Sequence, residues 1–314
     1  MAHQRGSQFA LAVAAVDVSR TRPSLTATVL IPTHTHGDTL RYSVPTALRQ
    51  TVGDIEVFIV GDGVPDVTRV IAAEFVAADS RVRFFDFPKG PSRGELRRHQ
   101  VLGQARGEIV CYLFDDDLWL PDHVAVMREM LRDNDFAFTR PVVVGPEGEL
   151  SAFFVDLASP LHRRLFTDSR SATASVPTCA AHTMALYRRL PFGWRTTPRG
   201  HAPDKYMWAQ CLADPACIAQ STSRPTALLF PDPPRRHWTP SRRLAELQHW
   251  SRGLDDPAWQ RQFHCDVTQL AKPPDWRLRI VWWCYARMLR VPVARTYLVA
   301  IGEWLVGWHR KRKR

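Results

Sequence analysis

Three consecutive carboxylates, Asp115, Asp116 and Asp117, are the residues of this chain best suited to chemistry. They follow the apolar run 109–114, which is typical of a buried strand. Adjacent carboxylates at a strand end repel one another unless a cation neutralises them, so the triplet indicates a site for a metal ion. The competing interpretation is a solvated acidic turn that also caps the following helix.

A second candidate, Asp204, lies in the segment Pro203-Asp204-Lys205-Tyr206-Met207-Trp208. The residues from 204 to 212 have helical character, so Asp204 stands at a helix start. There it can serve as a general base on the far side of a pocket, as a helix N-cap, or as both.

The elements that must position these residues alternate along the first half of the chain. Short apolar runs predict strands at 27–31, 55–60, 82–87 and 109–114, and helical spacing predicts helices at 39–50, 67–78, 95–105 and 123–133. This alternation predicts an α/β fold, with a mostly parallel sheet and helices on both faces. After Val142 the pattern weakens, although a hairpin turn at 146–148 and a strand at 151–155 are expected.

Polar residues follow three of the expected strands. They are Pro32-Thr33-His34, Gly61-Asp62-Gly63 and the aspartate triplet. In parallel sheets, ligands bind beyond the carboxyl ends of the strands, so we expect these three loops to converge on one site.

The order and spacing of these motifs resemble the family 2 glycosyltransferases, inverting enzymes with the GT-A nucleotide-diphospho-sugar transferase fold, over about residues 26–212. The matching segments are 29–33, 43–51, 56–63, 98–105 with 107–110, the triplet with Pro121, and 203–208. The resemblance implies transfer of a sugar from a UDP-, GDP- or dTDP-sugar to a glycan or lipid-linked acceptor.

The resemblance also implies a role for each matching residue. Asp116 aligns with the family's metal-binding aspartate, for Mn²⁺ or Mg²⁺, and a divalent cation there would stabilise the charge growing on the diphosphate leaving group. The residues implied to bind the donor are Pro32, Thr33, Asp62, Arg98 and Asp115. Arg98 is expected to pair with Asp62 or to touch the donor, unless it is a solvated helix cation.

On the acceptor side, Asp204 matches the family's catalytic base, which removes the proton of the attacking hydroxyl. Trp208, one helical turn on, is expected to pack the acceptor site. His237 lies in a segment where related enzymes have a loop over the diphosphate, so it is expected to complete the metal shell; an exposed basic loop is the alternative.

The sequence departs from the family pattern at four positions, Gly61, Phe114, Pro203 and His99. The key aspartates Asp62, Asp116 and Asp204 remain in place, but two alternative functions stay open. One is a nucleotidyltransferase-like or sugar-nucleotide hydrolase activity on the same fold. The other is a catalytically silent, membrane-associated partner of an active transferase.

The net charge of +11 is concentrated in the C-terminal third. Residues 231–314 contain 17 Lys and Arg, 7 Asp and Glu, and 8 of the 11 Trp. No nucleic-acid-binding signature accompanies them, so we expect an anionic membrane surface as partner rather than nucleic acid. An apolar stripe through residues 297–308 and the basic end 310–314 are expected to form an interfacial anchor, or else a helical pair packed on the catalytic domain.

The expected organisation has three parts: a leader segment 1–24, a GT-A domain 25–240, and a basic, Trp-rich helical region 241–314. The six cysteines show no CxxC spacing and indicate free thiols in a reducing compartment. We therefore expect a cytoplasmic protein, peripheral at the inner face of the membrane.

Overall fold

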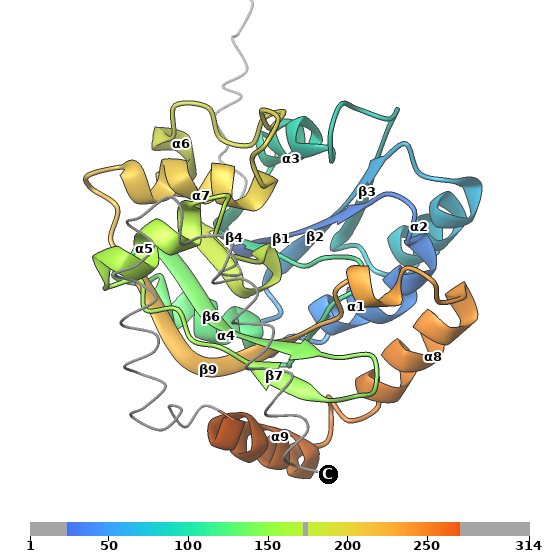
Figure 1. Ribbon diagram of the computed structural model, residues 1–314. Coiled ribbons are helices and arrows are strands. Elements are labelled where there is room, and N and C mark those ends of the chain that lie inside the picture. The colour runs from blue at the N-terminus through green and yellow to red at the C-terminus, as the bar shows by residue number, and fades with distance from the viewer. Residues whose placement is uncertain (1–23, 172–174, 271–314) are drawn as a thin grey trace, which may run out of the picture. The chain divides into compact units, whose positions relative to one another are not determined.

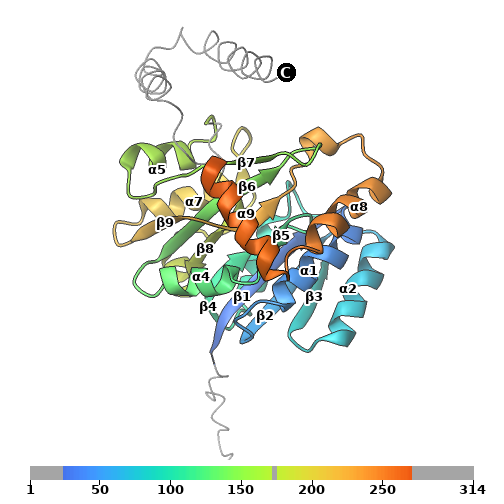
Figure 2. The ribbon, with the colours of Figure 1, turned by 90° about the horizontal axis from the view of Figure 1, so that it is seen from below.

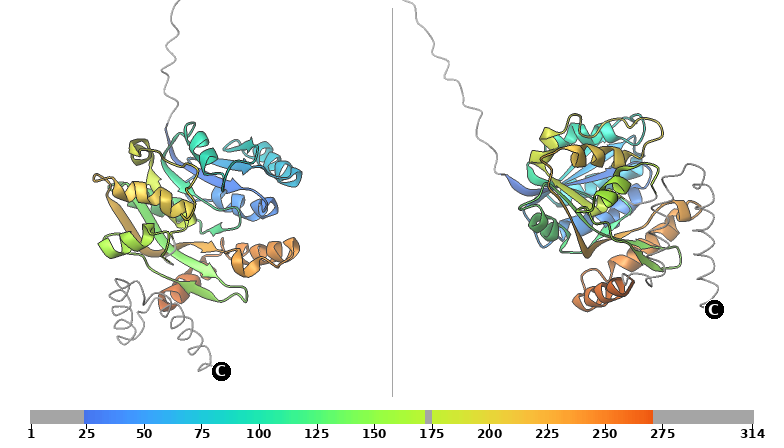
Figure 3. Two further views of the ribbon diagram at one scale, coloured as in Figure 1. Left: turned by 45° about the horizontal axis from the view of Figure 1, so that its top comes forward. Right: turned by 60° about the vertical axis from the view of Figure 1, so that its left-hand side comes forward.

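The computed structural model describes residues 24–171 and 175–270. The chain divides into two compact units, 1–261 and 262–314. The expected domain boundary at residue 240 falls where helix α8 (Pro240–Ser251) begins, and α8 packs on α1 (Leu40–Leu48) within the first unit (Figure 3). The predicted membrane stripe and basic end, and the leader up to residue 23, lie outside the described residues.

The first half of the chain forms the predicted parallel sheet. Its strands are β1 (Leu25–Thr33), β2 (Ile55–Asp62), β3 (Val82–Phe87) and β4 (Gly107–Tyr112), in the spatial order β3-β2-β1-β4. All three pairings in this half are parallel. Every residue of β2 is buried, as expected of a strand covered on both faces. The α/β prediction is confirmed.

Helices cover both faces of this half. The crossovers α1 and α2 (Asp66–Ala78) lie on one face with α4 (His123–Met130), and α3 (Glu95–Leu102) lies on the other with α6 (Met184–Arg189) and α7 (Pro203–Ala213) (Figures 1 and 2). Right-handed crossovers explain the change of face, because the chain returns from β3 across the sheet to place β4 beside β1.

The second half of the sheet is mixed. It continues from β4 through β8 (Ala180–Thr183), β6 (Phe136–Val144), β9 (Ala219–Leu229) and β5 (Leu118–Trp119), and β7 (Leu150–Ala152) pairs with β6. Only β6 and β9 are parallel here. The remaining helical elements are η1 (Gly37–Thr39), α5 (Pro160–Thr167), η2 (Pro177–Cys179), η3 (Pro233–Arg235) and α9 (Pro257–Leu270).

A buried carboxylate, Glu56, ties three strands of the parallel half together. It accepts hydrogen bonds from the hydroxyl of Thr28 at 2.7 Å and the backbone N–H of Arg106 at 2.6 Å, and it pairs with the Arg106 guanidinium at 3.2 Å. Its side chain is only 2% exposed. Thr28 in turn accepts from Gly107 N at 3.0 Å, so β1, β2 and β4 share one polar network.

We expect Glu56→Ala to lower the free energy of unfolding by about 2–4 kcal/mol, because buried donors would lose their acceptor. Glu108→Ala, at an exposed position of the same sheet, should change it by less than about 0.5 kcal/mol. Urea denaturation measures both. Equal effects of the two substitutions would contradict this role for Glu56.

Candidate functional site

The strand register brings the three polar loops to one edge of the sheet. Thr33 is paired with Gly61 across β1 and β2, and Asp62 is paired with Phe87 across β2 and β3. Since β4 runs parallel to β1, the segment after Tyr112 leaves the sheet at the same edge. The aspartate triplet, Asp62 and the Pro32-Thr33 turn therefore share this edge, as the sequence predicts.

The triplet is buried to different depths. Asp115 and Asp117 are 8% and 5% exposed, and the side chain of Asp116 between them is 14% exposed. Burial, together with the neighbouring charge of Asp116, raises the pKa of Asp115 well above its ordinary value and that of Asp117 to about 8. Burial also raises the pKa of Asp116, while Arg243 and His36 oppose the rise. Full ionisation of this group requires a compensating cation.

Asp117 has a structural role. Its Oδ2 accepts from the hydroxyl of Thr178 at 2.5 Å, and its Oδ1 accepts from Phe230 N at 3.0 Å. These bonds tie the triplet to η2 and to the end of β9. The bond to Phe230 fixes the start of the loop that carries Asp232.

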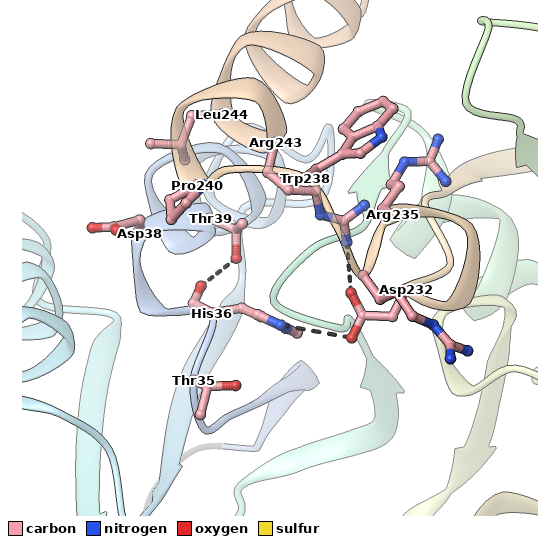
Figure 4. Close-up of a pocket in the computed structure, with 11 residues that line it drawn as sticks. Thr35, His36, Asp38, Thr39, Asp232, Arg235, Trp238, Pro240, Arg243 and Leu244 are labelled. Atoms are coloured by element: carbon pink, nitrogen blue, oxygen red, sulfur yellow. Dashed lines mark hydrogen bonds and ion pairs between the residues drawn. The ribbon is translucent and has the colours of Figure 1, made fainter.

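Asp116 faces a group of side chains from three separate parts of the chain (Figure 4 shows most of them). Its Oδ2 accepts from Arg243 Nη2 at 2.5 Å, and Arg243 also lies 3.4 Å from Asp232 Oδ1. The other oxygen of Asp232 lies 3.6 Å from His36 Nε2. Ligand atoms of His36, Asp116 and Asp232 all lie within 4.8 Å of one another.

This trio can hold a divalent ion. One imidazole nitrogen and two carboxylate oxygens are a donor set that suits Mn²⁺, and waters or phosphate oxygens can fill the remaining positions. Two of the trio, His36 and Asp232, line a cavity of about 320 Å³, which is also lined by Thr39, Arg235, Arg236, Trp238 and Arg243. A cavity of this size with convergent polar groups is an ordinary small-molecule site.

His237, the expected histidine ligand, is not part of the trio. It is exposed on the loop after η3, while the imidazole near Asp116 comes from His36, which follows β1. Gly37 lets the loop after β1 pack closely on α2, because a Cβ there would lie 1.8 Å from Thr68 Oγ1. The candidate histidine ligand is therefore His36, from the first crossover, and not His237, from the loop after η3.

Asp62 is held by the loop between β3 and α3. Its Oδ1 accepts from Gly90 N at 2.6 Å, and its Oδ2 pairs with Lys89 Nζ at 2.5 Å. Gly94 adopts φ 69°, and a Cβ there would lie 2.9 Å from the Asp62 carboxyl carbon. The partner of Asp62 is thus Lys89, not Arg98 as one of our expectations had it.

Arg98 is buried at 6% exposure, so it is not the solvated cation of the alternative interpretation. Its guanidinium lies 4.6 Å from the Trp194 ring centroid, and Nη2 donates to Arg93 O at 3.1 Å. Within the described part of the chain, its Nε and Nη1 have no hydrogen-bond partner. Burial lowers the pKa of Arg98, and the charges of Asp204 and Glu95 oppose that change. Arg98 is therefore a buried cation with two nitrogens that have no hydrogen-bond partner in the described chain.

Asp204 lies in the first turn of α7, whose N-cap is Ala202 rather than Asp204 itself. Burial raises its pKa to about 6, although Arg98 and Arg93 oppose the rise. The neighbouring Lys205 fixes this turn, because its Nζ donates to three carbonyl oxygens at the end of α5 and just beyond, those of Leu165, Asp168 and Ser171. Asp204 is thus a half-buried carboxylate with a pKa near neutrality, on a rigid support.

Trp208 lies in the core and not at an acceptor site. It is fully buried, its Nε1 donates to Ser175 O at 2.8 Å, and its ring packs against Tyr112 and Trp194. The aromatic cluster supports α7 and the Trp194 ring on which Arg98 rests.

The sequence analysis did not predict three residues near Asp116, namely His36, Asp232 and Arg243. His36 is visible as the second histidine of Pro32-Thr33-His34-Thr35-His36, directly after a strand end. Asp232 stands in a proline-rich loop and Arg243 in a generally basic helix, so neither has a distinguishing local signal. Only the pairing of β9 with β5 and β6 brings them to the triplet.

The family model for glycosyl transferase family 2 matches residues 28–193, more than half of the chain. The chain belongs to this family. The match runs from β1 to the loop before α7 and includes the aspartate triplet and Arg98. This family is the one that the motifs resemble.

Two curated relatives illustrate the similarity, each over part of the chain. One is the Escherichia coli UDP-Glc:alpha-D-GlcNAc-diphosphoundecaprenol beta-1,3-glucosyltransferase, 26% identical over 112 residues, which cover 35% of this chain and 42% of the relative. The other is the Campylobacter jejuni GalNAc(5)-diNAcBac-PP-undecaprenol beta-1,3-glucosyltransferase, 24% identical over 129 residues, covering 40% and 41%. The chain thus spans less than half the length of either relative.

Solved structures share the fold at low sequence identity. The mannosyltransferase from Pyrobaculum calidifontis in complex with GDP-Man and Mn²⁺ aligns with a TM-score of 0.51 at 18% identity, covering 93% of this chain and 83% of that one. The Staphylococcus aureus TarS fragment 1–349 with UDP-GlcNAc aligns with a TM-score of 0.52 at 15% identity, covering 66% and 59%. The GT-A fold is confirmed.

Proposed function

We propose that this protein is an inverting glycosyltransferase that moves a sugar from a nucleotide-diphospho-sugar to a glycan or lipid-linked acceptor. The observation that carries the proposal is the pairing of two different carboxylate sites. Asp116 belongs to a metal-binding trio with Asp232 and His36, while Asp204, on another element, has a pKa of about 6. A displacement with inversion needs charge stabilisation at the leaving group and one base at the acceptor.

Asp204 acts as the base in this proposal. Its carboxylate takes the proton of the acceptor hydroxyl while the hydroxyl oxygen attacks the anomeric carbon of the donor sugar. A base whose pKa lies close to the working pH combines a high deprotonated fraction with useful basicity. The buried Arg98 guanidinium nearby keeps that pKa from rising further.

The donor lies along the sheet edge. Pro32, Thr33 and Asp62 border the nucleoside, and Asp115 lies beside the ribose; Arg98 offers its two unpartnered donors to the donor's anionic part. His36, Asp116 and Asp232 would hold Mn²⁺ or Mg²⁺. When bound there, the ion supplies Lewis-acid stabilisation of the departing diphosphate.

The relatives support a lipid-linked acceptor. Both of the bacterial glucosyltransferases described above are named for diphosphoundecaprenol-type acceptors. None of the helices in residues 24–171 and 175–270 is long and apolar enough to cross a bilayer. We assign approach to the acceptor to the basic, Trp-rich C-terminal part, acting at the inner face of the membrane, because basic residues bind anionic headgroups.

Turnover tests the proposal. UDP-, GDP- and dTDP-sugars are offered with lipid-linked acceptors, and the anomeric configuration of the product is read by NMR. Asp204→Asn should lower kcat by about 10²–10⁴-fold, because the base is lost. Asp66→Asn, an exposed aspartate in the first turn of α2, is the matched control and should leave kcat unchanged. Retained configuration, or normal turnover by Asp204→Asn, would refute the base.

The pH profile provides a second prediction. Because Asp204 must be ionised to accept a proton, kcat/KM should be flat above pH 7 and should fall about tenfold per pH unit below pH 6. The limb reports the pKa of Asp204, which is raised from an ordinary value of 3.8. A limb near pH 4, or a limb near 6 that persists in the residual activity of Asp204→Asn, would assign it to another group.

Metal binding distinguishes the two candidate histidines. His36→Ala should weaken Mn²⁺ binding at least about tenfold, because one ligand is lost, and His237→Ala should leave it unchanged. Electron paramagnetic resonance of free Mn²⁺ measures both in the absence of nucleotide. The reverse ranking would restore His237 as the ligand and remove His36 from the site.

The membrane role is tested with vesicles. The full chain should sediment with vesicles containing anionic lipid, and replacing the five residues 310–314 by Gln should weaken this binding, at about 1 kcal/mol per charge near the surface. Neutral vesicles are the control. Unchanged binding to anionic vesicles by the substituted chain would exclude the basic end as the anchor.

A further inference from the structure

Arg243 contacts two residues of the proposed metal-binding trio, Asp116 and Asp232, although it is itself a cation. It is the fourth residue of α8, whose start is fixed by Pro240 and by the Thr239 hydroxyl, which accepts from Arg242 N at 3.3 Å. The Arg243 side chain is 10% exposed and points from α8 towards Asp232 (Figure 4).

The contacts of Arg243 coincide with two of the three candidate ligands. A single nitrogen, Nη2, lies 2.5 Å from Asp116 Oδ2 and 3.4 Å from Asp232 Oδ1, and it also donates to Phe230 O at 3.0 Å. The other terminal nitrogen, Nη1, lies 3.8 Å from Glu246 Oε2, and in the described chain this buried nitrogen has no hydrogen-bond partner. The guanidinium is thus held on one side only.

Arg235, which lines the same cavity, is engaged differently. It forms two hydrogen bonds with Glu246, at 2.6 and 2.7 Å, and donates to Val144 O at 2.9 Å and to Pro231 O at 3.2 Å. Its side chain is fully buried. Arg235 is therefore a structural cation with satisfied donors, whereas Arg243 is the cation that neutralises the acidic cluster.

A divalent ion in this site and the Arg243 guanidinium need the same two carboxylates, Asp116 and Asp232. An ion bound to Asp116 Oδ2 would stand within a few ångströms of Nη2, where two cations in a half-buried site repel each other by several kcal/mol at an effective dielectric constant of about 20. Binding of one cation therefore opposes binding of the other.

We propose that Arg243 is a built-in competitor of the divalent ion: it neutralises Asp116 and Asp232 in the metal-free enzyme and must leave them before the ion binds. The inference rests on the proposed metal site. Its consequence is that the free enzyme binds metal weakly, because each binding event breaks an existing ion pair. Once released, the guanidinium faces the cavity, where an anionic ligand such as a diphosphate offers it a new partner.

The test measures Mn²⁺ affinity without nucleotide, by electron paramagnetic resonance, in three proteins: wild type, Arg243→Gln and Arg236→Gln. Arg236 is exposed and lines the same cavity without an ion pair to the trio, so its variant reports the general effect of removing one positive charge. We expect Arg243→Gln to bind Mn²⁺ at least about tenfold more tightly than wild type, and Arg236→Gln to differ by less than about threefold.

Thermal unfolding gives an independent readout. In EDTA, Arg243→Gln should melt below the wild type, because Asp116 and Asp232 lose their cation, and saturating Mn²⁺ should raise its Tm by more than it raises that of the wild type. If Arg243→Gln does not fold, Arg243→Lys replaces it, because its single ammonium cannot hold both carboxylates as the guanidinium does; tighter Mn²⁺ binding than in wild type is again expected.

Equal or weaker Mn²⁺ binding by Arg243→Gln would overturn the inference and leave the proposed function standing. An equal gain of affinity in Arg236→Gln would also overturn it, since the effect would then be one of general charge. Absence of Mn²⁺ binding in wild type and variant alike would overturn the inference together with the metal part of the proposed function.

Discussion

The site depends on how three adjacent carboxylates are neutralised at the end of a buried strand. Burial and the neighbouring charge of Asp116 raise the pKa of Asp115 and of Asp117, so ionisation of the whole group has to be compensated. The structure meets this constraint with partners of different kinds. Asp117 is satisfied by hydrogen bonds from neutral donors, whereas Asp116 is satisfied by a cation.

One residue, Phe230, links these two groups of contacts. The N–H of Phe230 donates to Asp117, and the carbonyl oxygen of the same residue accepts from Arg243. The end of β9 is therefore fixed between the triplet and α8, and Asp232 follows two residues later. In this way, the two hydrogen bonds of Phe230 help to place Asp232 and Arg243 beside Asp116. The proposed base, Asp204, is held separately, because the neighbouring Lys205 donates to carbonyl oxygens at the end of α5 and just beyond.

The sequence predicts the parallel half of the fold well, because its strands are continuous apolar runs separated by helical segments of standard length. It also predicts that Thr33, Asp62 and Asp116 meet, since carboxyl ends of parallel strands share an edge. It does not predict β6 and β9, because their paired residues, such as Phe136 and Ala219, lie about 80 positions apart in the chain, with other strands and helices between them. The arrival of Asp232 and Arg243 at the site depends on that pairing. His237 was expected as a ligand because family spacing locates the loop that carries it. The spacing does not say which side chains of that loop face Asp116, and in the structure Asp232 does so while His237 is exposed.

We propose that this edge of the sheet is a metal-dependent nucleotide-sugar site. The most direct measurement is calorimetric titration of UDP-, GDP- and dTDP-sugars into the full chain, in Mn²⁺ and in EDTA. We expect one of the three to bind in Mn²⁺ and to bind at least about tenfold more weakly in EDTA. Binding of none of them to a folded sample, or binding that is indifferent to EDTA, would contradict it and would favour a catalytically silent relative of the family.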